Sequence, residues 1–308
     1  MRYYGVPYTG SKNFLAAWIM EHTPRSPLFV DAFAGGCAVT HAAMLAGKAD
    51  KYAANDISRH GVTLFRQAAS FAPACWRRWV WRDEFARYRD DSPMTSLVWS
   101  FGSKGRDYWC AREAEGYYHA LWLARANGDS SAWDEFAPCS PASDDIRQHA
   151  DEVRRAWEIY TGEPLTCAYP QELDPFARLN RLYAITEDGL NLDDLHTTVA
   201  DYSTLPTDDP ETIVYCDPPY HNSQRSYYYD GGKLVCFDFK RFNDWAKSIK
   251  ALPIISEYSM PEEDYTCVAS IDHLARLCAT KNKKVVERLF VPTSRVEEYY
   301  DRLNNSNI

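Results

Sequence analysis

The sequence predicts an α/β protein whose doubly wound, mostly parallel sheet is interrupted by a mainly helical insertion. Two observations lead to this prediction. Near the N-terminus an apolar run, a glycine turn, a helix-forming segment and a second apolar run follow one another in the order of a βαβ unit. Further apolar runs return only in the last third of the chain, after a long segment of different composition.

The first βαβ unit can be located residue by residue. Leu28 to Phe33 is apolar and predicts a strand, and Ala38 to Leu45 predicts a helix. Lys51 to Ala54 leads into a second strand that ends at Asn55 and Asp56. This order is the opening of a doubly wound sheet.

The middle of the chain has another character. Its segments are rich in Trp, Arg and Tyr and are broken at DDSP, ANGDSS, APCSPASDD and TGEP, which predicts a separate helical insertion. Four later runs predict strands that complete the sheet, with a helix near Phe239 to Leu252: TTVADYSTL, TIVYCDPPY, PIISEYSM and KKVVERLFV. We therefore expect one domain made of residues 1–62 and 195–308, and an inserted domain at residues 63–194.

Composition sets limits on function. The chain has 308 residues and a net charge of -9, which argues against a polycationic coat for nucleic acid but allows a local basic patch. Its 9 cysteines include no C-x-x-C pair, and its histidines do not cluster at zinc spacing, so we predict no metal site. No apolar run reaches the ~20 residues of a membrane helix, and we expect a cytoplasmic protein.

Residues directly after the apolar runs are the candidates for chemistry, because ligands of open α/β sheets bind beyond the carboxyl ends of the strands. In FVDAFAGGC, Gly35 and Gly36 permit a sharp turn and a close approach of the backbone to a ligand. Asp56 closes the next strand and can accept both hydroxyls of a ribose. A plain tight turn and a helix-capping acid are the alternative interpretations.

The stretch IVYCDPPYHNS carries the most specific signal. Two prolines predict a stiff elbow behind the strand, and since neither has an N–H, the carbonyls of the elbow stay available as acceptors. An exocyclic amine can then donate to Asp217 and to the carbonyl of Pro218 while Tyr220 stacks on its ring, as expected for an extruded nucleobase. An ordinary turn followed by a core tyrosine is the alternative.

Together, YTGSK, FAGGC and DPPY resemble the motifs of the Dam-like DNA adenine methyltransferases in their alpha arrangement. WSFGSKGRDYW and KKVVERLFV also look like segments of phage-borne members of that family. The resemblance covers residues 5–60 and 195–292. It implies a Rossmann-like fold that transfers a methyl group from S-adenosylmethionine to the exocyclic amine of a flipped adenine in double-stranded DNA.

The resemblance also implies a role for each matched residue. The cofactor would be bound by residues of the N-terminal motif, the glycine turn, the second strand and the VADYS segment, namely Tyr8, Gly10, Lys12, Asp31, Phe33, Gly35, Asp56, Asp201 and Tyr202. The catalytic group would consist of Asp217, Pro218, Pro219 and Tyr220. The chain departs from the family pattern at Cys37, where a third glycine or small residue is usual, and around Tyr8.

The insertion is the predicted DNA reader. Lys104 and Arg106 lie in the glycine-containing stretch FGSKGRDYW, where they can contact phosphates or base edges. The arginines of CWRRWVWRDEFARYRD would add to this surface, whereas we expect Trp76, Trp79 and Trp81 to be core residues. The stretch RSYYYDGG is either a loop that closes over the base or a surface hairpin.

Two alternatives to a DNA adenine methyltransferase stay open on the sequence. One is a methyltransferase for RNA or for a protein amide, and the other is a non-catalytic DNA-binding or cofactor-sensing protein with the same fold. Asp rather than Asn before the two prolines, together with the long insertion, favours DNA adenine. The complete set of motifs favours an active enzyme, which we expect to be a monomer. The sequence does not predict whether a partner restriction enzyme exists, nor which DNA sequence is recognised.

Overall fold

The computed structural model describes residues 2–127, 131, 174–220, 227–230, 233–278 and 281–306. The chain divides into two compact units. The first unit contains Met1–Phe71, Ile185–Leu274 and Lys284–Ile308, and the second contains Ala72–Ala184 and Ala275–Lys283. The assignment of catalysis to one domain and of DNA recognition to an inserted one stays a prediction.

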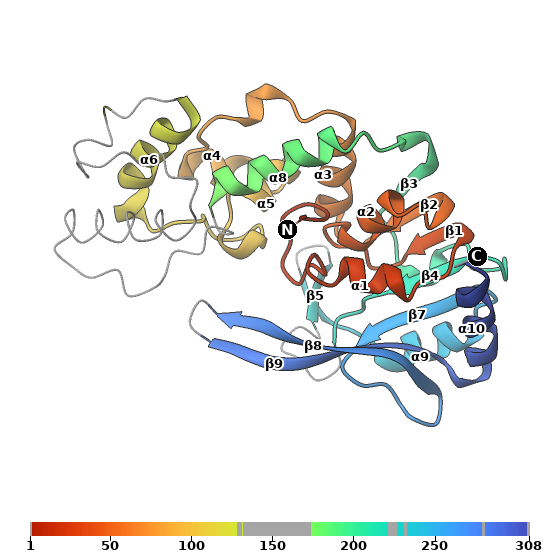
Figure 1. Cartoon of the computed structure of the whole chain (residues 1–308). Helices are drawn as coiled ribbons and strands as arrows, with labels where there is room; N and C mark the ends of the chain where they lie inside the picture. Colours follow the sequence, from red (N-terminus) through yellow and green to blue (C-terminus); the bar gives the residue numbers. More distant parts are fainter. Residues whose placement is uncertain are drawn as a thin grey trace. The chain divides into compact units, whose positions relative to one another are not determined.

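A mixed seven-stranded sheet forms the centre of the first unit, with the strand order β3-β2-β1-β4-β7-β9-β8 (Figure 1). The first five strands in this order are parallel, and β9 runs antiparallel to β7. Their bounds are β1 (Ser26–Asp31), β2 (Ala49–Asn55), β3 (Leu195–Thr198), β4 (Ile213–Cys216), β7 (Leu252–Glu257), β8 (Tyr265–Cys278) and β9 (Lys281–Pro292). The predicted α/β class is confirmed.

Two strands differ from the sequence prediction. β3 ends at Thr198, before most of the TTVADYSTL run, because Asp201 caps a short 3-10 helix, η6 (Tyr202–Thr204), through the backbone N–H of Ser203. β8 was not predicted at all. It is the outer strand of the sheet and most of its described side chains are half-buried or exposed, so it lacks the continuous apolar run that marks a strand buried on both faces.

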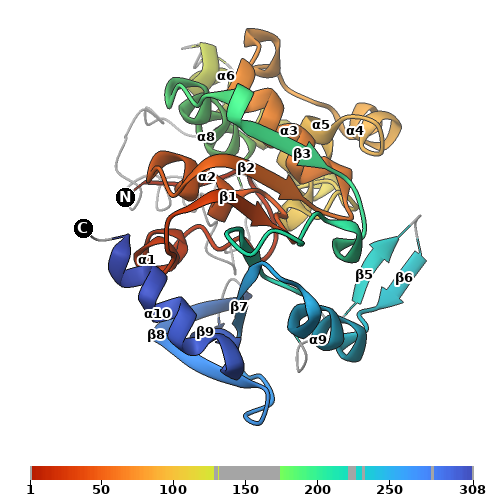
Figure 2. The same cartoon turned by 90° about the vertical axis from the view of Figure 1, so that its right-hand side faces the viewer.

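Helices cover both faces of the sheet, as Figure 2 shows. On one side lie α1 (Ala16–Glu21), α2 (Ala38–Leu45) and α10 (Val296–Asn305), and on the other lies α9 (Phe239–Ser248). Val30, Val214 and Phe242 belong to the buried cluster beneath α9. Since side chains alternate along a strand, Asp31 points to the opposite face, where it contacts Thr40 of α2.

The sheet has a switch point between β1 and β4. These strands are neighbours, with Asp31 opposite Tyr215, but β1 continues through α2 to β2 on one side and β4 continues to β7 on the other. Ligands of open α/β sheets bind outside the carboxyl ends of such a strand pair. The glycine turn after β1 and the proline elbow after β4 therefore lie at the edge where a ligand is expected.

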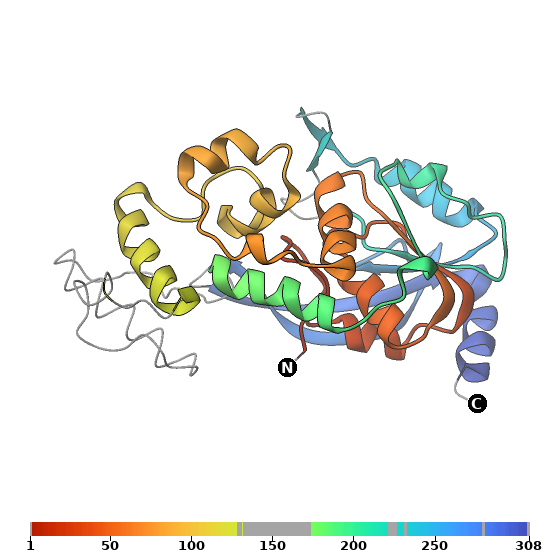
Figure 3. The same ribbon diagram turned by 90° about the horizontal axis from the view of Figure 1, so that it is seen from above.

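Helices dominate the described part of the second unit (Figure 3). They are α4 (Arg82–Tyr88), α5 (Pro93–Val98), α6 (Glu115–Asn127) and most of α8 (Pro175–Glu187). α5 begins where Ser92 accepts the N–H of Thr95 and Pro93 occupies the first turn, a common helix start.

The predicted burial of the tryptophans is only partly confirmed. Trp79 is 7% exposed and packs edge to face against Trp99 and Trp109, so it is a core residue. Trp81 is 47% exposed, which makes the prediction wrong for this residue. It precedes α4 and, among the described rings, contacts only those of Trp79 and His119, so about half of its surface stays open to solvent. Trp76 is half-buried.

The hairpin β5 (Tyr227–Asp230) and β6 (Lys233–Cys236) is antiparallel and forms a separate two-stranded sheet. The first residues of RSYYYDGG and its two glycines lie outside the described residues. The backbone thus agrees with the hairpin interpretation, and closure over a base stays a prediction.

Gly61, in the first turn of α3 (Arg59–Ser70), touches the glycine turn that follows β1. A Cβ atom on this residue would lie 1.7 Å from the carbonyl oxygen of Gly35 and 3.3 Å from the amide nitrogen of Gly36. No side chain fits at the first of these distances. The helix and the turn can pack this closely only because residue 61 has no Cβ.

We expect Gly61→Ala to lower the free energy of unfolding by about 1–3 kcal/mol, the usual cost of overpacking. Gly116→Ala is the matched control, because Gly116 also lies in a helix but has open space around its Cβ position. This second change should raise stability by about 0.5–1 kcal/mol. Urea denaturation measures both values, and equal effects of the two substitutions would contradict the contact at Gly35.

Candidate active site

A buried acid ends β1 at the switch point. Asp31 is 1% exposed, and its Oδ2 accepts a hydrogen bond of 2.7 Å from the hydroxyl of Thr40. Its Oδ1 is buried and has no hydrogen-bond partner among the described residues. Burial raises the pKa of Asp31 to about 7 against the opposing hydrogen bond of Thr40, with a smaller contribution from the nearby charge of Asp217.

The glycine turn is tied to the end of β2 through Asp56. Its Oδ2 accepts from the backbone N–H of Gly35 at 2.8 Å, and its Oδ1 accepts from that of Ser58 at 2.7 Å. Burial raises the pKa of Asp56 to about 6, although these two hydrogen bonds oppose the shift. The turn has positive φ at Gly35 (50°) and at Cys37 (58°), so the departure from the family pattern at Cys37 is accommodated in a left-handed conformation.

The N-terminal motif packs on the other side of this turn. Val6 donates its N–H to the carbonyl of Gly36 at 2.8 Å. A Cβ on Gly35 would lie 2.9 Å from the ring of Tyr8, and one on Gly36 would lie 2.6 Å from the Cβ of Tyr8. The negative charge of Asp56, followed by burial, raises the pKa of Tyr8, so this phenol stays protonated. Gly10 has a φ of 83° and is exposed.

Lys12 reaches the proline elbow and forms an ion pair with Asp217. Its Nζ donates to Oδ1 at 2.7 Å and to Oδ2 at 2.8 Å, and the side chains are 11% and 17% exposed. Desolvation lowers the pKa of Lys12, but the charges of Asp217 and Glu287 outweigh it and the pKa is raised. Burial raises the pKa of Asp217 while Lys12 opposes the shift. Pro218 is buried behind the pair, and Pro219 is half-buried.

Tyr220, the last residue of the elbow, is held on several sides. Its hydroxyl donates to Oε1 of Glu287. Its ring meets that of Tyr258 edge to face, with 4.6 Å between centroids, and the ammonium of Lys12 lies 4.7 Å from its centroid. These contacts fix the plane of the ring, which is the property needed for a stacking surface.

Glu287 is a site residue that the sequence reasoning missed. It lies on β9, is 2% exposed, and its Oε1 also accepts a 2.7 Å hydrogen bond from Ser256 of β7. A signal was present in KKVVERLFV, where Glu287 shares one face of the strand with the apolar residues Leu289 and Val291. Acids are almost never fully buried unless they are paired, so this position pointed to a partner at the site.

Three more predicted cofactor residues lie together near the end of β3. The rings of Phe33 and Tyr202 are 5.2 Å apart, and Tyr202 is buried in an aromatic cluster with Phe237. Asp201 precedes Tyr202 and is held by both terminal nitrogens of Arg241, at 2.8 and 2.9 Å. Burial would raise the pKa of Asp201, but the hydrogen bonds from Arg241 and Ser203 outweigh it and lower that pKa.

Lys104 and Arg106 belong to the second unit, unlike the predicted cofactor and catalytic residues. Both are exposed on a loop that an antiparallel bridge closes between Ser100 and Tyr108. Arg178 anchors the base of this loop by donating to the carbonyl of Ser100 at 2.8 Å. The loop is therefore held in shape while its two cations face solvent.

Several arginines of CWRRWVWRDEFARYRD have partners within the second unit. Arg78 pairs with Glu84, and the guanidinium of Arg82 donates to the carbonyl of Cys110 at 2.6 Å. These contacts reduce the contribution that the two side chains can make to a DNA surface.

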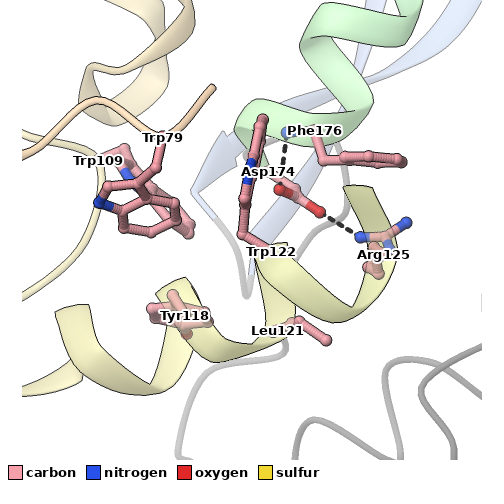
Figure 4. A pocket seen from close by; sticks show the side chains of 8 residues that line it. All are labelled: Trp79, Trp109, Tyr118, Leu121, Trp122, Arg125, Asp174 and Phe176. Atoms are coloured by element: carbon pink, nitrogen blue, oxygen red, sulfur yellow. Dashed lines mark hydrogen bonds and ion pairs between the residues drawn. The ribbon is translucent and has the colours of Figure 1, made fainter. Parts of the chain in front are cut away.

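The second unit also contains an aromatic pocket, shown in Figure 4. Trp79, Trp109 and Trp122 line it, together with the ion pair of Arg125 and Asp174 at 2.5 Å. Each of these tryptophans is less than 10% exposed and packs against another, so we assign the pocket to the core of this unit. It contains none of the predicted catalytic residues.

Comparison with known families finds a match in the N-terminal part of the chain. Residues 8–76 match the model described as D12 class N6 adenine-specific DNA methyltransferase. The match covers 69 of the 308 residues, so it shows a similarity of the N-terminal segment to this family. The matched segment contains the N-terminal motif with Lys12, the glycine turn and Asp56, so the resemblance seen in the sequence is confirmed there.

Among solved structures, the chain is similar to a protein from Haemophilus influenzae described as a "putative methylase". The similarity covers 91% of this chain and 86% of that one, with 10% sequence identity and a TM-score of 0.31, which is too low to bear on the fold or the activity. No curated protein matches the chain.

Within the described residues, no group of His, Cys, Asp or Glu side chains could hold a metal ion, and no helix has the length and apolarity needed to span a membrane.

Asp31 makes the stability of the protein dependent on pH. Its pKa is about 7 in the folded state against 3.8 for the free side chain, so the folded protein retains a proton that the unfolded chain loses as pH rises. We expect the unfolding free energy to fall by up to about 1.4 kcal/mol per pH unit between about pH 4 and pH 7 from this group.

Urea denaturation at several pH values measures this slope. Asp31→Asn should flatten it, whereas the control Asp244→Asn, which alters an exposed carboxylate on α9, should leave it unchanged in this range. An identical slope in Asp31→Asn and in the wild type would show that Asp31 does not retain its proton.

Proposed function

We propose that the protein transfers the methyl group of S-adenosylmethionine to the exocyclic amine of an adenine flipped out of double-stranded DNA. One observation carries this proposal: the elbow residues Asp217 and Tyr220, joined by Lys12, lie at the end of β4, next to the strand that ends in Asp31 and the glycine turn. A carboxylate that can accept from an amine and a ring on which a planar base can stack thus lie beside a glycine turn of the kind that binds cofactors.

The cofactor fits the residues at the end of β1. The buried, unpartnered Oδ1 of Asp31 is suited to an ammonium group, which would satisfy it. Asp56 can accept hydroxyls of a ribose in addition to the backbone N–H groups that it already holds. When bound, S-adenosylmethionine supplies a methyl group on a positively charged sulfur.

The cofactor's adenine ring would contact the aromatic cluster near the end of β3. Phe33 is half-buried there and can present its ring, while Tyr202 supports it from within the cluster. Asp201 stays ionised because Arg241 is paired with it, and its oxygens can accept from an exocyclic amine. Lys12 and Tyr8 would border the methionine end, and Gly10 gives their segment its turn.

The elbow would orient the reacting amine. Asp217 and the carbonyl of Pro218 accept its two N–H hydrogens, which favours a pyramidal nitrogen with its lone pair directed at the methyl carbon. If S-adenosylmethionine is bound there, the N–C bond would form as the C–S bond breaks, the bonding pair would stay on sulfur, and one N–H proton would pass to solvent through the carboxylate of Asp217. Stacking on Tyr220 contributes about 1–3 kcal/mol and offsets part of the cost of unstacking the base.

Methyl transfer from labelled S-adenosylmethionine to duplex DNA, to RNA and to protein tests the substrate class. We expect label in DNA alone, at adenine N6, as mass spectrometry of the digested nucleosides would show. Label in RNA or protein but not in DNA would support the first alternative. Failure to bind the cofactor by calorimetry would support a non-catalytic protein.

Asp217→Ala should lower kcat by at least about 10²–10³-fold, the usual loss when one group that stabilises a transition state is removed. Cofactor affinity, measured by calorimetry, should stay detectable because Asp31 and Asp56 are unchanged. The control Asp244→Ala removes an exposed acid of α9 and should keep normal turnover. Near-normal methylation of adenine by Asp217→Ala would refute the assigned role.

Lys104→Ala and Arg106→Ala should each weaken DNA binding to a similar degree across sequences if the side chain binds a phosphate. The slope of log K against log salt should then decrease by about 1 for each phosphate that the variant no longer binds. Lys240→Ala is the matched control, since Lys240 is an exposed cation in the other unit that pairs with Asp244. Unchanged affinity together with an unchanged slope would exclude the residue from the DNA surface.

A further inference from the structure

Glu287 is a buried charge that the proposed reaction does not use. It is 2% exposed on a strand whose neighbouring residues Leu289 and Val291 are buried apolar side chains. Removing a carboxylate from water is costly unless its partners compensate, and an apolar residue would suit the interior of β9 better. A role at the site explains why an acid lies here.

The partners of Glu287 come from separate parts of the first unit. Ser256 of β7 and the hydroxyl of Tyr220 donate to its Oε1, while Nε2 of His273 on β8 lies 3.5 Å from its Oε2. The ammonium of Lys12 lies 3.9 Å from Oε1. Glu287 thus touches or borders two residues of the candidate active site, and neither contact depends on the second unit.

Lys12 lies between two carboxylates at unequal distances. It makes hydrogen bonds of 2.7 and 2.8 Å to Asp217 and stays at 3.9 Å from Glu287. Both oxygens of Asp217 are therefore engaged by a cation in this structure. A base amine that donates to Asp217 has to compete with that cation or displace it.

We propose that Glu287 is a positioning residue that receives Lys12 when an adenine amine binds Asp217, and that holds the ring of Tyr220 in the stacking orientation. The inference rests on the proposed function. A small movement of the ammonium toward Oε1 would convert the 3.9 Å approach into a hydrogen bond, so the cation always keeps a buried anionic partner. Asp217 is then free to accept from the base.

Glu287→Gln tests this idea, because an amide oxygen can still accept from Tyr220 and Ser256 but carries no charge. We expect unchanged affinity for S-adenosylmethionine and a loss of about 10²-fold in kcat/KM for DNA, the size of loss seen when a reacting group is misplaced. The fluorescence of 2-aminopurine at the target position reports base flipping and should decrease in the same variant.

Ser256→Ala is the matched control. It removes a hydrogen bond to the same oxygen of Glu287 and leaves every charge in place, so base flipping and turnover should remain close to those of the wild type. Tyr220→Phe removes only the hydroxyl and should weaken flipping less than Glu287→Gln does. Glu287→Asp, which keeps the charge, should restore part of the activity.

A double-mutant cycle shows whether Glu287 acts through Lys12. Glu287→Gln and Lys12→Met should each lower the 2-aminopurine fluorescence at saturating cofactor. The loss in the double variant should differ strongly from the sum of the two single losses. Normal flipping and normal kcat/KM in Glu287→Gln, or strict additivity with Lys12→Met, would overturn the inference.

The wild-type enzyme separates this test from that of the proposed function. If it transfers no methyl group to DNA, the proposed function fails; if it is active and Glu287→Gln is equally active, only the role of Glu287 fails. Thermal melting checks the fold of each variant. If Glu287→Gln does not fold, base flipping is measured in Glu287→Asp and Tyr220→Phe instead. Base flipping equal to that of the wild type in both variants would overturn the proposal.

Discussion

The candidate site depends on the ion pair between Lys12 and Asp217. The two residues are 205 positions apart, and their contact joins the N-terminal motif to the elbow after β4. A pair that is mostly removed from water is stable only with good geometry and further partners, and here both carboxylate oxygens are bonded and Glu287 lies nearby. Removal of Lys12 would leave the charge of Asp217 buried without its counter-ion, whereas removal of Asp217 would leave Lys12 with Glu287, at 3.9 Å, as its anionic neighbour.

The fold brings this pair next to the glycine turn. β1 and β4 are adjacent and parallel, so Asp31 and Asp217 follow neighbouring strands at the same edge of the sheet. The N-terminal motif passes over the turn, where Val6 bonds Gly36, before it reaches Lys12. The predicted cofactor residues and the proline elbow are therefore connected through the N-terminal backbone as well as through the neighbouring strands β1 and β4.

Much of this arrangement could be predicted from the sequence, and the rest depends on contacts between distant segments. Apolar runs located β1, β2 and β4, and the residues behind them gave the candidate acids. The partner of Asp217 could not be predicted, because nothing local in YTGSK indicates which anion Lys12 meets. Glu287 was missed because the apolar residues of its strand alone were used for the prediction. β8 was missed because an outer strand with few buried side chains lacks a continuous apolar run.

The contact between Gly61 and Gly35 has a consequence for ligand binding. The turn is confined by α3 on one side and by the ring of Tyr8 on the other, so its backbone has little freedom to adjust. A binding loop that is already rigid in its bound shape loses little conformational entropy when a ligand arrives, and more of the contact energy appears as affinity. The same rigidity makes this loop intolerant of ligands whose shape requires it to move.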